Sequence, residues 1–146
     1  MSKEVFHSKD YFIQRDDDTS VNLSEITRFV VAENFQHHSV NYTKEYLAAE
    51  VSELYSDESL YSNHSTYYVA RDAANQMIGA IRIMKWDKKC ELPIQKIWGI
   101  NPLSETGTMN IQGNIWHVGR FAISSSKNVA GLSLFKQLLV YALAPL

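Results

Sequence analysis

The sequence is poor in cysteine, and this scarcity argues against two kinds of site. Cys90 is the only cysteine among the 146 residues, so no disulfide forms within the chain. Neither a histidine nor a second cysteine stands near Cys90 at the spacing of metal ligands. The sequence therefore predicts neither a disulfide framework nor a metal site.

Basic runs and long apolar runs are missing as well. The chain carries 14 Lys and Arg residues against 16 Asp and Glu residues, a net charge of −2, which gives no reason to expect a nucleic acid partner. No apolar stretch approaches the length of a membrane span, and the first residues lack the charged-then-apolar pattern of a signal peptide. We therefore expect a cytoplasmic protein without a membrane partner.

The composition that remains is that of an ordinary globular domain. Apolar residues make up 45% of the chain and charged residues 21%. A chain of 146 residues is long enough for one domain with a core, which we expect to span residues 1–146. The sequence holds no Ser-His-Asp arrangement and no dinucleotide-binding fingerprint.

The first half of the chain is predicted to be mainly helical. Residues 1–21 are a polar lead-in with a short strand at residues 11–13. A helix follows over residues 22–37, where Asn22 and Glu25 have the spacing of a capping box. A second helix is predicted from an apolar stripe, with its aromatic members in the core. The stripe consists of Tyr46, Leu47, Val51, Leu54 and Tyr55.

After residue 65 the apolar pattern changes from helical to strand-like. Residues 66–70 and 77–84 are predicted to form a β-hairpin. Gly79 inside the second strand indicates a bulge or a close backbone approach. Residues 87–113 are expected to be rich in loops.

The nearly continuous apolar positions of residues 115–123 predict a strand that is covered on both faces. A polar loop at residues 124–131 leads into a last helix. Its predicted buried face consists of Leu132, Phe135, Leu138, Leu139 and Ala142. This order of elements predicts an α/β (α+β) fold, a mixed and mostly antiparallel sheet flanked by helices.

The loop before the last helix suggests a site for an anion. A loop of small residues that opens a helix exposes unpaired backbone N–H groups at the positive end of the helix dipole, where a phosphate binds well. An ordinary strand–loop–helix connection explains the same pattern. Both interpretations stay open.

Two motifs carry a resemblance to a known family. Residues 79–84 read Gly-Ala-Ile-Arg-Ile-Met, and residues 116–123 read Trp-His-Val-Gly-Arg-Phe-Ala-Ile. Together with the order of elements, they resemble the GNAT acyltransferases. The resemblance is strongest to the acyl-homoserine-lactone (autoinducer) synthases and the N-acyl amino acid synthases, and it covers about residues 66–141.

The resemblance implies an acyltransferase that moves an acyl group from a thioester to an amine. Coenzyme A or acyl-CoA would enter as a substrate, an acyl carrier protein is a second possible donor, and no metal is needed. Strand backbone would pair with the pantetheine arm and stabilise the oxyanion, while loop N–H groups would hold the pyrophosphate. The implied donor site consists of Val118, Phe121, Ile123, Ser125, Ser126, Lys127, Asn128, Ala130 and Gly131.

Arg82, Arg120 and His117 are the candidate catalytic side chains. An arginine in the middle of an apolar strand is costly unless it is paired. The two arginines either bind an acceptor carboxylate or order the donor site, or they form structural ion pairs with Glu25, Glu33 or Glu45 on a helix. His117 is either a general base or a structural residue.

Trp98 and Trp116 are open to two interpretations as well. They either line an acyl pocket or pack in the core.

The chain departs from the family at several places. His117 and Gly119 stand where the family has Glu and Ser, which argues against a homoserine-lactone product. The family continues after the last helix with further strands, whereas this sequence ends at Leu146. We therefore expect a shortened or truncated domain, or a homodimer that covers the strand edge and the apolar helix.

Two alternatives to an enzyme follow from these departures. One is a non-catalytic module that binds acyl-CoA or another small ligand, including an inactive remnant of the fold. The other is an oligomeric structural domain without a ligand.

Overall fold

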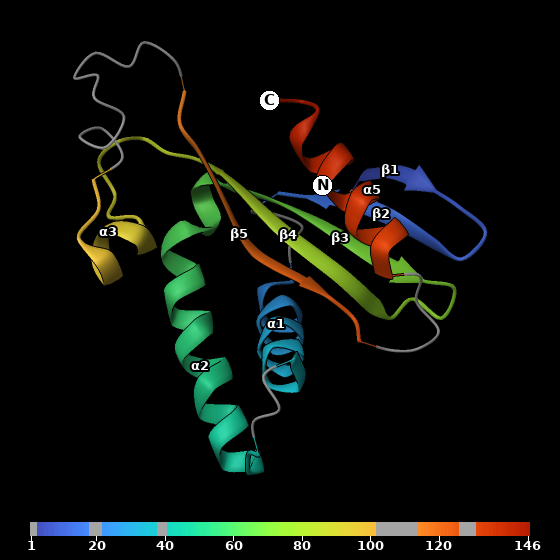
Figure 1. Cartoon of the computed structure of the whole chain (residues 1–146), viewed down its shortest axis with the longest axis horizontal. Helices are drawn as coiled ribbons and strands as arrows, with labels where there is room; N and C mark the ends of the chain where they lie inside the picture. The colour runs from blue at the N-terminus through green and yellow to red at the C-terminus, as the bar shows by residue number, and fades with distance from the viewer. Residues whose placement is uncertain (1–2, 18–21, 38–40, 102–113, 126–130) are drawn as a thin grey trace.

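One antiparallel sheet, in the order β1-β2-β3-β4-β5, organises the chain (Figure 1). The computed structural model describes residues 3–17, 22–37, 41–101, 114–125 and 131–146. The strands are β1 (Lys3–His7), β2 (Tyr11–Asp16), β3 (Ser65–Asp72), β4 (Met77–Lys85) and β5 (Trp116–Ile123). The helices are α1 (Leu23–His37), α2 (Lys44–Tyr61), the 3-10 helix η1 (Ser62–His64), α3 (Pro93–Trp98) and α5 (Gly131–Leu143).

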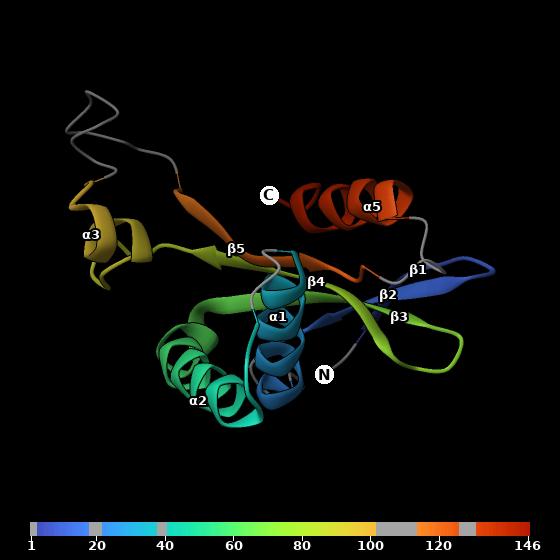
Figure 2. The same ribbon diagram turned by 60° about the horizontal axis from the view of Figure 1, so that its bottom comes forward.

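The helices cover the two faces of the sheet. Figure 2 shows α1 and α2 on one face and α5 on the other. The alternation of side chains along β3 supplies both cores, because Tyr67 and Val69 pack with α1 whereas Tyr68 and Ala70 pack with α5. The predicted α/β (α+β) class is thus confirmed, and every pairing among the described strands is antiparallel.

The predicted cap at the start of α1 is present, but the predicted capping box is not complete. Oδ1 of Asn22 accepts a hydrogen bond from the backbone N–H of Glu25 at 3.1 Å and so caps α1. The Glu25 side chain does not close a capping box but pairs with Arg71 of β3. Thr43, which the sequence analysis did not single out, caps α2 in the same way through the N–H of Tyr46.

The amino-terminal residues are more ordered than the sequence suggested. Instead of a polar lead-in, β1 and β2 form a hairpin that extends the sheet along β3. Ser8 closes its turn, since its backbone N–H donates to the carbonyl of Tyr11 at 2.8 Å. The pairing gives partners to backbone groups that the polar composition alone would leave to water.

The bulge predicted at Gly79 is confirmed, whereas the atoms that approach this glycine closely belong to side chains and not to backbone. The register between β3 and β4 shifts beside it, between Ala70 and Arg71. A Cβ atom at position 79 would lie 2.8 Å from a methyl group of Leu138, so the missing side chain lets α5 approach the sheet.

One prediction about burial is wrong, and two others hold only in part. The strand buried on both faces is β4, not β5, which is an edge strand among the described residues and leaves Val118 exposed. Helix α5 buries Leu138 and Ala142 as predicted, together with Leu134. The predicted Leu132 and Phe135 are exposed instead. On α2 the tyrosines 46 and 55 are exposed as well, and Tyr46 stacks on Phe35.

Candidate functional site

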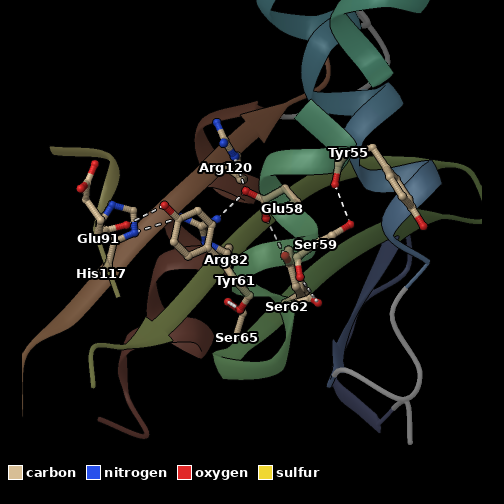
Figure 3. A network of polar contacts seen from close by, with 11 residues as sticks. Tyr55, Glu58, Ser59, Tyr61, Ser62, Ser65, Arg82, Glu91, His117 and Arg120 are labelled. Atoms are coloured by element: carbon tan, nitrogen blue, oxygen red, sulfur yellow. Dashed lines mark hydrogen bonds and ion pairs between the residues drawn. The ribbon is translucent and has the colours of Figure 1, made fainter. Parts of the chain in front are cut away.

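A buried carboxylate, Glu58, is the centre of the candidate site (Figure 3). It lies in the last turn of α2 with none of its surface exposed. Its oxygens accept hydrogen bonds from the Tyr67 hydroxyl at 2.6 Å, from Nε of Arg120 at 2.5 Å and from Nη1 of Arg82. Donors from β3, β4 and β5 therefore converge on one side chain of α2.

The environment of Glu58 keeps it ionised. Burial by itself would raise the pKa of this carboxyl, but the charge of Arg82 and the hydrogen bonds from Tyr67 and Arg120 hold the pKa below its usual value. Burial also raises the pKa of Tyr67, and the charge of Glu58 adds to that effect. Tyr67 therefore remains a protonated donor to a charged acceptor.

Arg82 is fully buried in β4 and satisfies the predicted need for a partner. The partner is Glu58, so the expected pairing with Glu25, Glu33 or Glu45 is wrong. The guanidinium also lies over the Tyr61 ring, with 5.1 Å between its Cζ atom and the ring centre. The structural interpretation of Arg82 is thereby supported.

Arg120 reaches the same carboxylate because the backbone of β5 is irregular. The register between β4 and β5 shifts between Ala80 and Arg82, so that Arg120 and Phe121 together oppose a single residue. Arg120 has φ of 51°, in the left-handed region that few side chains adopt. This bulge turns Arg120 toward α2, whereas Phe121 faces α5 and contacts Phe135.

Gly119 leaves the space that Arg82 occupies. A Cβ atom at this position would lie 2.7 Å from Nη2 of Arg82. The glycine at position 119 thus has a packing reason in this chain.

His117 approaches the buried arginine from β5. Its Nδ1 atom lies 3.1 Å from Nη2 of Arg82. A guanidinium only donates hydrogen bonds, so Nδ1 accepts and the ring proton resides on Nε2. Burial lowers the pKa of His117, and the charges of Arg82 and Arg120 lower it further, against the opposite effect of Glu58. The neutral ring has no free lone pair in this geometry, which weakens the general-base hypothesis.

We expect the stability of the protein to fall as the pH drops below about 6.5, the ordinary pKa of histidine. The lowered pKa of His117 means that, below this pH, the unfolded chain binds a proton that the folded chain does not. In His117→Gln an amide oxygen can still accept from Arg82, so that variant should lose this slope. The exposed His64→Gln is the matched control and should keep it. Urea unfolding between pH 5 and 8 measures both, and an unchanged slope in His117→Gln contradicts the assignment.

A cavity of about 400 Å³ opens above Arg120, between α1, α2 and α3. Apolar walls and charged side chains share its lining, which includes Phe35, Leu54, Glu53, Asp57, Lys96 and Arg120. Arg120 therefore connects the buried carboxylate to a space large enough for a small molecule.

The strand residues of the predicted donor site do not line this cavity. Val118 pairs with Ile83, whose side chain packs in the core beneath α5, and Phe121 and Ile123 pack against that same core. Val118, Phe121 and Ile123 of β5 therefore face the α5 side of the sheet. The candidate catalytic side chains, His117 and Arg120 of β5 and Arg82 of β4, lie on the α2 side.

The predicted anion loop is described only at its two ends. The backbone N–H of Ser125 donates to the carboxylate of Glu33 at 3.0 Å, so one predicted phosphate donor already serves an internal anion. Gly131 begins α5. Ser126, Lys127, Asn128 and Ala130 lie outside the described residues.

The tryptophan predictions are corrected in part. Trp98 is 75% exposed and Trp116 is 38% exposed, so neither packs in the core, and neither lines the cavity above Arg120. The buried tryptophan is Trp86, whose Nε1 donates to the carbonyl of Cys90 at 2.9 Å.

Glu58, the central residue, was not among the predicted site residues, although the sequence carries a signal for it. Leu47, Val51, Leu54, Glu58 and Tyr61 follow one another at intervals of three and four residues along α2. A carboxylate on the apolar stripe of a helix requires a buried cation. The apolar stripe of α2 continues past Tyr55 to Glu58, so the sequence pattern indicates that Glu58 pairs with a buried arginine of the sheet.

Within the described ranges, no three His, Cys, Asp or Glu side chains gather closely enough to hold a metal ion. None of the helices in these ranges combines the length and apolar character needed to cross a membrane. No family model matches the chain, and no curated protein or solved structure matches it either.

Proposed function

We propose that this protein is a cytoplasmic N-acyltransferase, which moves an acyl group from the thioester of coenzyme A or an acyl carrier protein to an amine. The observation that carries the proposal is the bulge at Arg120 and Phe121 in an edge strand beside a cavity. The outer edge of a strand offers backbone groups to the pantetheine amides. A bulge interrupts the ladder and frees a backbone donor for the developing oxyanion.

In this proposal the two substrates bind at different sides of β5. The thioester lies along the outer edge, near Phe121 and Ile123, and the amine reaches it from the cavity on the α2 face. There the carboxylates of Glu53 and Asp57 attract an ammonium group, and Arg120 orients the acceptor. The amine nitrogen, once deprotonated, attacks the thioester carbonyl; the carbon–sulfur bond breaks and the thiolate takes up a proton.

A non-catalytic module that binds acyl-CoA or another small ligand is the second candidate. This alternative is favoured because the candidate catalytic groups already have partners within the protein. Arg82 and Arg120 form ion pairs with Glu58, and Nδ1 of His117 accepts a hydrogen bond from Arg82. Binding without turnover on any amine would select this alternative.

The first experiment is a calorimetric titration with coenzyme A and a series of acyl-CoAs, followed by turnover assays with a panel of amines. We expect saturable binding and turnover, and Arg120→Ala to lower kcat/KM by about 10²-fold, because a small displacement of the bulge misplaces the donor. Arg120→Gly tolerates the left-handed backbone and should lose less. Arg71→Ala, which breaks an ion pair away from the cavity, is the control.

Two results would contradict the proposal. One is the absence of turnover with both acyl-CoA and acyl carrier protein thioesters. The other is turnover that Arg120→Ala leaves at the level of Arg71→Ala.

A further inference from the structure

One end of the molecule presents apolar side chains to solvent. Figures 1 and 2 show α3 at this end, beyond the end of β4. Leu60 at the end of α2 is 70% exposed, and Ile97 and Trp98 of α3 are 69% and 75% exposed. We call these three residues, together with the partly exposed Ile94, the apolar tip. Such a concentration of large apolar side chains indicates a surface that meets another phase or molecule.

Buried residues and one hydrogen bond attach the inner side of α3 to the rest of the protein. Leu92 at the start of α3 is buried beside Tyr61, Met84 and Trp86. The Tyr61 hydroxyl donates to the carbonyl of Glu91 at 2.8 Å. These contacts fix one side of a six-residue helix and leave its other side outward, where an apolar groove of about 360 Å³ runs along Ile97 and Trp98.

The segment that carries Ile94, Ile97 and Trp98 of the tip has a net positive charge, whereas the whole chain has a net negative one. Residues 85–98 hold four lysines and two acidic residues, a net charge of +2, while the whole chain has −2. The carboxylate of Asp87 is turned into its own loop, where it accepts the N–H groups of Lys89 and Cys90. Lys85, Lys89 and Lys96 are exposed, and no described carboxylate forms an ion pair with them.

We propose that the apolar tip docks on an anionic lipid bilayer. Tryptophan and isoleucine enter the boundary between headgroups and acyl chains, and flanking lysines extend toward lipid phosphates. A second copy of the chain fits this surface less well, because residues 85–98 of the two copies, each with a net charge of +2, would come together. The proposal departs from the expectation of no membrane partner and does not depend on the proposed function.

Docking in this way also places the cavity near the bilayer. Leu60 and Ile97 of the tip line the cavity above Arg120, and so does Lys96. A ligand that partitions into the membrane would therefore enter the cavity without crossing bulk water.

The test is co-sedimentation with vesicles of phosphatidylcholine alone or mixed with phosphatidylglycerol, at low and high salt. We expect binding to the anionic vesicles, and the double variant Ile97→Ser with Trp98→Ser should weaken it by about tenfold or more. Replacing Lys85, Lys89 and Lys96 by Gln should weaken it by about 10²-fold at low salt. Leu132→Ser, at a position of α5 that is 70% exposed, is the matched control and should bind as before.

The fluorescence of Trp98 gives a second readout that does not depend on the folding of the double variant. In a Trp116→Phe background, Trp98 is the exposed tryptophan and Trp86 stays buried. We expect its emission to shift to the blue on anionic vesicles and to be quenched by brominated acyl chains. The proposal is overturned if the protein does not sediment with anionic vesicles, if both vesicle types bind it equally, or if Leu132→Ser weakens binding as much as the tip variant.

Discussion

Glu58→Gln is expected to lower the free energy of unfolding by about 3–5 kcal/mol, because it leaves a buried cation without its counter-ion. Arg82 has almost no exposed surface, and Glu58 is its only carboxylate partner among the described residues. An amide of the same shape keeps the packing but removes the charge. Chemical denaturation of the variant and the parent protein measures the difference.

Two further variants identify the cause of that loss. Glu53→Gln changes an exposed carboxylate on the same helix and should alter stability by no more than about 0.5 kcal/mol. The double variant Glu58→Met with Arg82→Met removes both charges and should recover much of the stability, since apolar pairs often replace buried ion pairs without loss. A double variant as unstable as Glu58→Gln would contradict the ion-pair explanation.

The same pair contributes to acid sensitivity. The folded pKa of Glu58 lies below the ordinary value of 4.5, so its stabilising effect is complete above that pH. The effect is lost as the pH falls through the folded pKa, a window separate from the one assigned to His117.

Leu138→Ala is expected to lower the free energy of unfolding by about 2–5 kcal/mol, because it opens a cavity in the core under α5. Leu138 has no exposed surface and lies against Gly79 of β4. Leu132→Ala, the same change at an exposed position of the same helix, should cost no more than about 0.5 kcal/mol. Thermal or urea unfolding of both variants measures the difference.

The pair of leucine variants also tests whether α5 is covered in solution. A homodimer that buries the outer side of α5 would make Leu132→Ala costly, and its effect would depend on protein concentration. Equal losses in the two variants would contradict the face that α5 buries in the structure. Light scattering at the concentrations used for unfolding separates these cases.

Elements whose signals are local could be predicted from the amino-acid sequence alone. The change of apolar period after residue 65 predicted the hairpin of β3 and β4, and the side chain of Asn22 predicted the start of α1. The cost of burying a charge also predicted that Arg82 needs a partner. Each of these inferences depends on a few neighbouring residues and on the energetics of one side chain.

The identity of the carboxylate that pairs with Arg82 depends instead on long-range packing. Glu58 lies 24 residues from Arg82 and 62 residues from Arg120, and helix packing brings it to them. The bulge that turns Arg120 toward α2 has no residue type that marks it, because a register shift depends on the pairing of two strands.

The sequence likewise did not determine which sides of β5 and α5 are buried. Apolar residues fill β5 almost as densely as β4, yet the order of strands places one at the edge and the other inside. Leucines surround much of α5, so its pattern admits more than one buried face until Gly79 lets Leu138 approach the sheet. Composition and apolar period predicted whether a segment forms a helix or a strand, whereas long-range packing determined which residues that segment contacts.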